Sequence, residues 1–267
     1  MPSPLVEMRG ITRRFGHIVA LQDLDFTLFP GEIRALLGDN GAGKSTLIKI
    51  LTGVYRPTQG CIRFQGHEVH LNTPQDARAL GIETVYQDLA LIPRMSIAHN
   101  FYLGREKTRR TGPFALLDRE TMNTQTTRAL HAIGIHIRNP DEPVGSLSGG
   151  ERQSIAIGRA VHFGSRLLIM DEPTSALSIG ETRKVLGYIK AAKEKGLAVI
   201  FITHNIHHVF EVADRLTLLG RGRKIGDFDR EALTPEEAAG MIMGEGLPKR
   251  LEKAPIDPPG GAPESPL

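Results

Sequence analysis

The chain has 267 residues, a length that suits one large or two small domains and is ample to bury a core. With 40% hydrophobic and 24% charged residues, the composition is that of a globular protein and excludes wholesale disorder. Lys and Arg number 33 against 30 Asp and Glu, and the net charge of +3 is too small and too evenly scattered to indicate nucleic-acid binding.

Neither a membrane span nor a secretion signal is predicted. The longest apolar run, residues 197–202, is far shorter than the roughly 20 residues that a membrane helix needs. Residues 1–5 contain no basic stretch followed by an apolar one. Cys61 is the one cysteine, so it cannot form an internal disulfide, which fits a reducing compartment. We therefore expect a soluble cytoplasmic protein.

The chain alternates short apolar segments with turn residues and then changes to an α/β pattern. A helix is predicted to begin near Lys44, after a glycine-rich loop. Strands are predicted at residues 5–8, 24–28, 32–37, 61–64, 167–170 and 197–203. The last two are compact apolar runs suited to strands buried on both faces. Cys61 is expected to be a small buried hydrophobic residue in its strand.

A segment of different composition separates the two halves of this α/β core. Residues 88–163 are rich in Ala, Arg, Thr and His at helical spacing, which predicts an inserted helical subdomain. The core then comprises residues 1–87 and 164–246, and the whole of 1–246 forms one domain. Six of the last 20 residues are proline, which predicts a disordered tail at 247–267.

A phosphate-binding loop lies between a predicted strand and the helix near Lys44. It matches the pattern G-x-x-x-x-G-K-[ST] and reads Gly38-Asp39-Asn40-Gly41-Ala42-Gly43-Lys44-Ser45, with Thr46 next. Its glycines let backbone N–H groups surround phosphate oxygens, and the helix dipole adds positive potential. Lys44 can neutralise the β- and γ-phosphates, and the Ser45 hydroxyl can bind Mg²⁺. The loop predicts binding of ATP with Mg²⁺, the alternative being a turn that merely joins strand to helix.

Two adjacent carboxylates end the apolar segment 167–170. We predict that Asp171 holds Mg²⁺ from the second coordination shell, and that Glu172, on the opposite side of the strand, polarises an attacking water. His204 ends the segment 197–203 in the same way, so it can hydrogen-bond the γ-phosphate and align that water. Two alternatives remain for this histidine: a metal ion shared with His208, or a hydrogen-bonded place in the core.

A glycine-rich segment in the second half completes a recognisable set of motifs. It reads Leu147-Ser148-Gly149-Gly150-Glu151-Arg152-Gln153 and precedes a helix-like stretch at 155–161. With the phosphate loop before it and Asp171-Glu172 after it, the set resembles the nucleotide-binding subunit of ATP-binding cassette (ABC) transporters over residues 5–225. The resemblance implies an α/β fold: a P-loop NTPase (RecA-like) core with an antiparallel β subdomain and the helical insertion.

The resemblance also implies roles for residues that carry little signal alone. Gln87 looks like the glutamine at the junction with the helical subdomain, where it contacts Mg²⁺ and senses the γ-phosphate. Phe15 takes the place of the aromatic residue that stacks on adenine, unless it is a core residue. Ser175-Ala176-Leu177 looks like the family's D-loop. In ABC ATPases two cassettes pair head to tail, so Ser148, Gly149 and Gly150 would cap the γ-phosphate held by a partner cassette.

Within the family the resemblance is to importers of monosaccharides of the ribose, xylose or fructose type. The segments that carry it are Leu51-Thr52-Gly53-Val54, Pro74-Gln75-Asp76-Ala77, Gly81-Ile82-Glu83-Thr84-Val85-Tyr86-Gln87 and Phe210-Glu211-Val212-Ala213-Asp214-Arg215. It implies three partners: transmembrane permease subunits, a second cassette (an identical chain or a paralogue) and, indirectly, an extracytoplasmic sugar-binding protein. The chain would then lie on the inner face of the membrane through the permease.

The sequence departs from this pattern in three places and leaves rival functions. Asp39 stands where the family usually has Glu, Ser178 where an acidic or polar residue is common, and the chain carries one cassette where many relatives carry two. The rivals are a soluble ABC-type ATPase outside transport, an importer of a non-sugar solute, and a nucleotide switch without hydrolysis. Glu172 and His204 argue against the last of these, and a P-loop kinase would have no use for residues 147–150.

Overall fold

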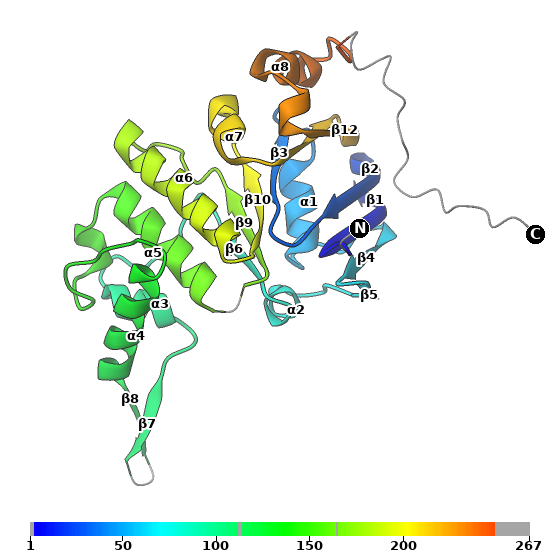
Figure 1. Ribbon diagram of the computed structural model, residues 1–267. Helices are drawn as coiled ribbons and strands as arrows, with labels where there is room; N and C mark the ends of the chain where they lie inside the picture. The colour runs from blue at the N-terminus through cyan, green and yellow to red at the C-terminus, as the bar shows by residue number, and fades with distance from the viewer. Residues whose placement is uncertain (1–2, 112–113, 164, 249–267) are drawn as a thin grey trace, which may run out of the picture.

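The computed structural model describes residues 3–111, 114–163 and 165–248, and Figure 1 shows how its elements are arranged. The strands are β1 (Val6–Phe15), β2 (Ile18–Leu28), β3 (Ile33–Gly38), β4 (Gln59–Phe64), β5 (His67–Glu68), β6 (Ile82–Val85), β7 (Thr108–Thr111), β8 (Phe114–Leu117), β9 (Leu167–Asp171), β10 (Ala198–Ile202), β11 (Arg215–Gly220) and β12 (Arg223–Asp229). The helices are α1 (Lys44–Leu51), α2 (Pro74–Ala79), α3 (Ile97–Tyr102), α4 (Arg119–His131), α5 (Gly149–His162), α6 (Ile179–Glu194), α7 (Ile206–Val212) and α8 (Pro235–Met243), with 3₁₀ turns η1 (Val144–Ser146) and η2 (Arg230–Ala232). The predicted tail lies outside the described residues beyond Pro248.

A six-stranded sheet forms the centre of the fold. Its order is β12-β11-β3-β10-β9-β6, and all its neighbours pair in parallel except the edge strand β12, which is antiparallel to β11. All five residues of β10 are buried. Continuous apolar runs such as β9 and β10 form interior parallel strands because helices cover both of their faces. The two predicted buried strands are therefore confirmed.

The two faces of the sheet belong to two separate hydrophobic cores. Along β10, Ala198, Ile200 and Ile202 pack in the core that contains α1 and the antiparallel sheet. Val199 and Phe201 pack in the core that contains α5, α6, α7 and α8. This alternation follows from the two-residue period of a strand. None of the described helices is long and apolar enough to cross a membrane.

The antiparallel β subdomain is a four-stranded sheet in the order β2-β1-β4-β5. β1 and β2 are longer than the predicted strands at 5–8 and 24–28, because they remain paired as far as Phe15 and Ile18. The register shifts between Met8 and Ile11 and again between Ile11 and Arg13. These bulges break the alternation of buried and exposed residues by which a strand is recognised in a sequence.

The insertion is mainly helical and has a hydrophobic core of its own. Helices α3, α4 and α5 pack around buried side chains that include Phe101, Met122 and Ile155. The sequence did not predict the strands β7 and β8, which form an antiparallel hairpin with Arg109 opposite Leu116. In Figure 1 this hairpin extends away from the helices. Each strand has only four residues, with β7 entirely polar and β8 entirely apolar. Neither therefore shows the alternation that identifies a strand, and the helical composition of the rest of residues 88–163 masks both.

Candidate functional site

The strands that precede the phosphate loop, Asp171 with Glu172, His204 and Gln87 all end at the carboxyl-terminal edge of the six-stranded sheet, whereas Phe15 ends β1 in the antiparallel sheet. β3 ends at Gly38 and β9 at Asp171. His204 comes two residues after β10, and Gln87 two residues after β6. The register places Ile202 of β10 beside both Leu36 and Asp171, and Val85 of β6 beside Met170. Parallel strands therefore bring loops that are distant in sequence to one edge, which is where open α/β sheets bind ligands.

The phosphate loop needs glycine where it approaches other strands. A Cβ on Gly38 would lie 2.5 Å from the carbonyl oxygen of Leu219, and one on Gly43 would lie 2.6 Å from Leu21 Cδ2. Gly41 and Gly43 also have positive φ, of 81° and 104°. Glycine adopts this conformation without strain, so the loop can curl tightly over the start of α1. A concave row of backbone groups of this kind suits phosphate oxygens.

The start of α1 differs from the start of every other described α-helix. Helices α2 to α8 each begin with a side chain that accepts a hydrogen bond from a backbone N–H of the first turn. Gly43 provides no such cap for α1, and the first turn of α1 contains no acidic residue. The first backbone N–H groups of a helix need acceptors and carry the positive end of its dipole. This end of α1 fits an external anion such as a phosphate group.

Lys44 is folded back onto the loop that precedes it. Its Nζ donates hydrogen bonds to the carbonyl oxygens of Gly38 at 2.6 Å and Asp39 at 3.0 Å. Burial lowers the pKa of Lys44, and the nearby carboxylates of Glu172, Asp39 and Asp171 oppose that shift. The ammonium group thus faces both the loop and the carboxylates at the ends of the strands. Ser45 and Thr46 follow in the first turn of α1, with Ser45 exposed.

The two adjacent carboxylates lie in different environments. Burial, and then the negative charge of Glu172, raises the pKa of Asp171, while Lys44 opposes the shift. Glu172 lies beyond the end of β9 with φ of 51°, and its N–H donates to the carbonyl oxygen of Ile202 at 2.9 Å. Its direction is therefore set by this left-handed backbone rather than by the simple alternation of a strand. Carboxylate oxygens are ligands suited to Mg²⁺.

His204 and Glu172 form a pair. His204 Nδ1 lies 2.9 Å from Glu172 Oε2, and the side chain of His204 is 79% exposed against 19% for Glu172. His204 is therefore not a core histidine. The His208 ring faces Thr174 and Asn205 instead, so the two histidines have different partners. Within the described ranges, no three His, Cys, Asp or Glu residues are grouped so that they could hold a metal ion.

Phe15 belongs to an aromatic cluster that the sequence did not predict. Its ring is 36% exposed and meets the ring of Tyr55 edge to face, with centroids 5.1 Å apart. The guanidinium carbon of Arg13 lies 4.5 Å from the centroid of Phe15 and 5.3 Å from that of Tyr55. A half-exposed ring is available for stacking, so Phe15 is not a plain core residue. The sequence does not indicate that Tyr55 contacts Phe15, because Tyr55 lies in the segment after α1, far from Phe15 along the chain.

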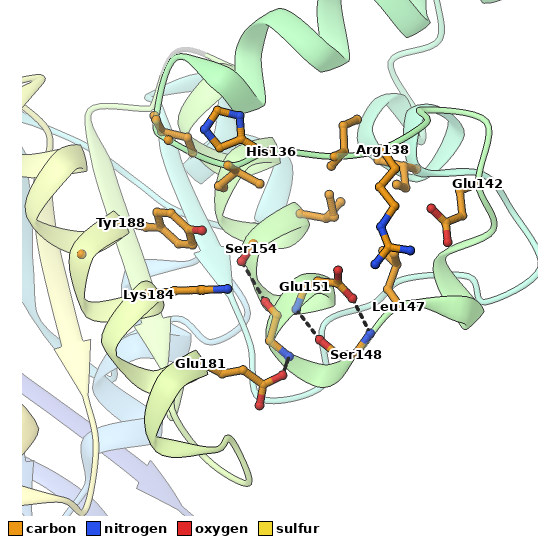
Figure 2. A pocket seen from close by; sticks show the side chains of 18 of the residues that line it. His136, Arg138, Glu142, Leu147, Ser148, Glu151, Ser154, Glu181, Lys184 and Tyr188 are labelled. Carbon is orange, nitrogen blue, oxygen red and sulfur yellow. Dashed lines mark hydrogen bonds between the residues drawn. The ribbon is translucent and has the colours of Figure 1, made fainter.

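Ser148, Gly149 and Gly150 lie apart from the phosphate loop, at the start of α5 in the helical insertion. Figure 2 shows the cavity beside them, which has a volume of about 800 Å³ and no lining residue from the phosphate loop. The Ser148 hydroxyl accepts from the N–H of Glu151 at 3.2 Å, and the Glu151 carboxylate accepts from the N–H of Ser148 at 2.8 Å. This capping box starts α5, where Ser148 is exposed and Gly150 is buried. One chain therefore does not bring this segment to its own phosphate loop.

The family is decided by comparison with known proteins. The family model described as ABC transporter matches residues 21–175, more than half of the chain. The chain belongs to the ABC transporter family. The match begins in β2 and ends just after Glu172, so it includes the phosphate loop, Ser148–Gly150, Asp171 at the end of β9 and Glu172 directly after it. The family resemblance predicted from the motifs is confirmed.

Similar ABC-family proteins include sugar-import subunits. The fructose import ATP-binding protein FrcA of Rhizobium meliloti is 44% identical, covering 92% of this chain and 96% of that protein. The ribose import ATP-binding protein RbsA 1 of Rubrobacter xylanophilus is 41% identical, and this chain spans half of its length. The ADP conformation of MJ1267, an ATP-binding cassette of an ABC transporter, matches with a TM-score of 0.77 at 22% identity, over 94% of this chain and 98% of that one. That likeness confirms the predicted fold class.

Proposed function

We propose that this ABC-family chain is the ATP-hydrolysing subunit of an importer that takes up a monosaccharide through a separate membrane permease. The observation that carries the proposal is the uncapped start of α1, with Lys44 in its first turn and the carboxylates of Asp171 and Glu172 near enough to act on the Lys44 pKa. The relatives named for fructose and ribose import support a sugar as the transported solute. The sugar itself would be selected by the permease and an extracytoplasmic binding protein.

ATP and Mg²⁺ fit the residues at this edge. The N–H groups at the start of α1 and the Lys44 ammonium would hold the β- and γ-phosphates, and Lys44 would exchange its present carbonyl acceptors for phosphate oxygens. Ser45 and Gln87 would hold Mg²⁺, with Asp171 in the second shell. When bound, Mg²⁺ neutralises charge on the phosphate oxygens. Phe15 would stack on adenine with the ring face that Arg13 leaves open.

In this proposal Glu172 and His204 would activate water. The Glu172 carboxylate would accept the proton of the attacking water as the general base. The contact of 2.9 Å between His204 Nδ1 and Glu172 Oε2 orients both side chains. Because His204 is largely exposed, its second ring nitrogen can reach a γ-phosphate oxygen.

A second cassette is required in this proposal. Ser148, Gly149 and Gly150 lie on the insertion, and the helix end that they form would cap the γ-phosphate held by the phosphate loop of another copy or a paralogue. Two such half-sites make two complete sites only when the cassettes pair head to tail. ATP would therefore join the cassettes, and ADP, which lacks the γ-phosphate, would release them.

A groove on this chain would suit the permease as a docking site, and its lining includes Thr84 and Ala90, which lie on either side of Gln87 in sequence. The groove, of about 240 Å³, lies where the core meets the insertion, and its lining also includes Glu83, Leu103, Arg105, Arg159 and Phe163. Arg105 bridges the two parts: it pairs with Glu83 of β6 at 2.6 Å and lies 4.6 Å from the ring centroid of Phe163. A cytoplasmic segment of the permease seated there would be moved when Gln87 responds to the γ-phosphate. The chain would lie on the inner face of the membrane through this contact.

Purification with a candidate permease, followed by assays of phosphate release and of sugar uptake in proteoliposomes, tests the proposal. We expect Mg²⁺-dependent ATP hydrolysis that rises when the sugar-loaded binding protein is added. Hydrolysis without permease association would favour a soluble ABC-type ATPase, and uptake of a non-sugar solute would overturn the assignment of a monosaccharide. ATP binding without hydrolysis in the complete transporter would favour a nucleotide switch.

A further inference from the structure

The N-terminus of α5 already binds an anion from its own chain. The backbone N–H of Gly150 donates a hydrogen bond of 3.0 Å to Glu181 Oε1, in the first turn of α6 (Figure 2). Gly150 is one of the residues that the proposed function assigns to the γ-phosphate on a partner cassette. A carboxylate and a phosphate are both anions and bind a helix N-terminus through the same N–H groups. They cannot occupy the Gly150 N–H at the same time.

Glu181 is held in this position from both sides. Its Oε2 accepts hydrogen bonds from the N–H of Ser178 at 3.0 Å and from the Ser178 hydroxyl at 2.9 Å. Hydrogen bonds from Ser178 and Gly150 lower the pKa of Glu181 to about 2, so the carboxylate is charged at neutral pH. The absence of a side chain at Gly150 allows the approach, since a Cβ there would lie 2.5 Å from Glu181 Cγ. The contact thus joins the insertion to the segment that follows Ser175-Ala176-Leu177.

Open space and a lysine adjoin the Glu181 carboxylate, so it could move away from Gly150. Glu181, Gly150 and Ser148 line the cavity of about 800 Å³, so open space adjoins the hydrogen bond. Lys184, one helical turn further along α6, lines the same cavity and points into it in Figure 2. Side chains three residues apart on a helix are neighbours. Lys184 is exposed and has no hydrogen bond or ion pair with any other residue that the structure describes, so its ammonium can receive the displaced carboxylate.

We propose that Glu181 is an internal competitor for the γ-phosphate: its carboxylate holds the Gly150 N–H in the separate cassette and moves to Lys184 when ATP on a partner cassette takes that N–H. This inference rests on the proposed head-to-tail pairing. It adds that competition from Glu181 raises the ATP concentration at which two cassettes pair. The Gly150 N–H thus has an acceptor in the separate cassette as well as in the pair. Pairing requires an anion that binds the Gly150 N–H better than Glu181 does.

The test measures the ATP concentration needed for pairing. In a Glu172→Gln background, which retains ATP, sedimentation velocity gives the dimer fraction of the full chain across an ATP titration, with ADP as a second series. Adding Glu181→Ala should lower the ATP concentration at half-pairing by about tenfold, because one charge-assisted hydrogen bond no longer competes at each site. Asp76→Ala is the matched control, since Asp76 forms the same kind of capping box with Thr73 on α2, outside this cavity.

Loss of a helix cap alone predicts a different result. Both substitutions remove a capping-box carboxylate that also accepts one further backbone N–H, and they should lower the Tm by similar amounts, yet Glu181→Ala alone should make pairing easier. Unchanged or weaker pairing of the Glu181→Ala variant, while the parent pairs in ATP, would overturn the inference and leave the proposed function intact. If the parent does not pair in ATP at any concentration, the head-to-tail model fails and the inference fails with it.

Discussion

Replacing Glu172 by Gln should separate ATP binding from hydrolysis. The amide keeps the size of the side chain and can still hydrogen-bond His204, whose Nδ1 lies 2.9 Å from Glu172 Oε2, but it cannot take a proton from water. Loss of a positioned general base costs about 10²–10⁴-fold in rate, which corresponds to roughly 3–5 kcal/mol of transition-state stabilisation. We therefore expect hydrolysis by the complete transporter to fall by about 10²–10⁴-fold.

The surrounding charges predict that binding survives the same substitution. Glu172 is the second largest cause that raises the pKa of Asp171, after burial, so its removal makes Asp171 easier to ionise near Mg²⁺. The Kd for ATP in Mg²⁺ should be unchanged or lower. Phosphate release at saturating ATP gives the rate, and isothermal titration calorimetry gives the Kd.

Comparison with a control variant, Glu68→Gln, tests whether Glu172 is the general base. Glu68, exposed on the edge strand β5, supplies the control: Glu68→Gln should change neither the rate nor the Kd. If hydrolysis by the Glu172→Gln variant falls less than about tenfold, Glu172 is not the general base. A large rise in Kd would instead show that the carboxylate serves binding, which contradicts the electrostatic reasoning.

Three further predictions test other parts of the site. Lys44→Ala should weaken ATP binding by about 10²–10⁴-fold, because two charge-assisted contacts to phosphate are lost; equal affinity by calorimetry would show that the phosphate loop is wrongly assigned. Gln87→Ala should retain ATP binding but lower the sugar transported per ATP in proteoliposomes, because Gln87 follows β6 where the core meets the insertion; proportional losses of hydrolysis and transport would indicate a purely catalytic role. The pKa of Glu181 is lowered from 4.5 to about 2, so its stabilisation is complete above pH 4.5 and is lost as the pH falls toward 2. The Tm difference between wild type and Glu181→Gln should therefore be constant from about pH 7 to 5 and shrink below about 4.5; a difference that does not shrink in thermal melts would refute the linkage.

The family, the fold class and the parallel strands that precede the phosphate loop, Asp171 and His204 could all be predicted from the sequence, whereas β6, which precedes Gln87, was not predicted. The phosphate loop is a contiguous motif between an apolar strand and a helix, and Asp171 and Glu172 directly follow an apolar run. Contiguous motifs can be identified from sequence because the chemistry requires fixed residue types at fixed spacing. The predicted strand at 167–170 ends within one residue of β9, since a strand buried on both faces has no polar residue to confuse its limits.

Tertiary structure alone decided the features whose partners are distant in sequence. Pairing across bulges extended β1 and β2 beyond their predicted limits, and the hairpin β7–β8 formed where local periodicity is weak. Arg13 and Tyr55 reached Phe15 from different segments. Glu181 met Gly150 across 31 residues because α5 and α6 pack where a glycine permits close approach. Local propensity and spacing cannot specify such contacts, because they depend on how whole elements pack in three dimensions.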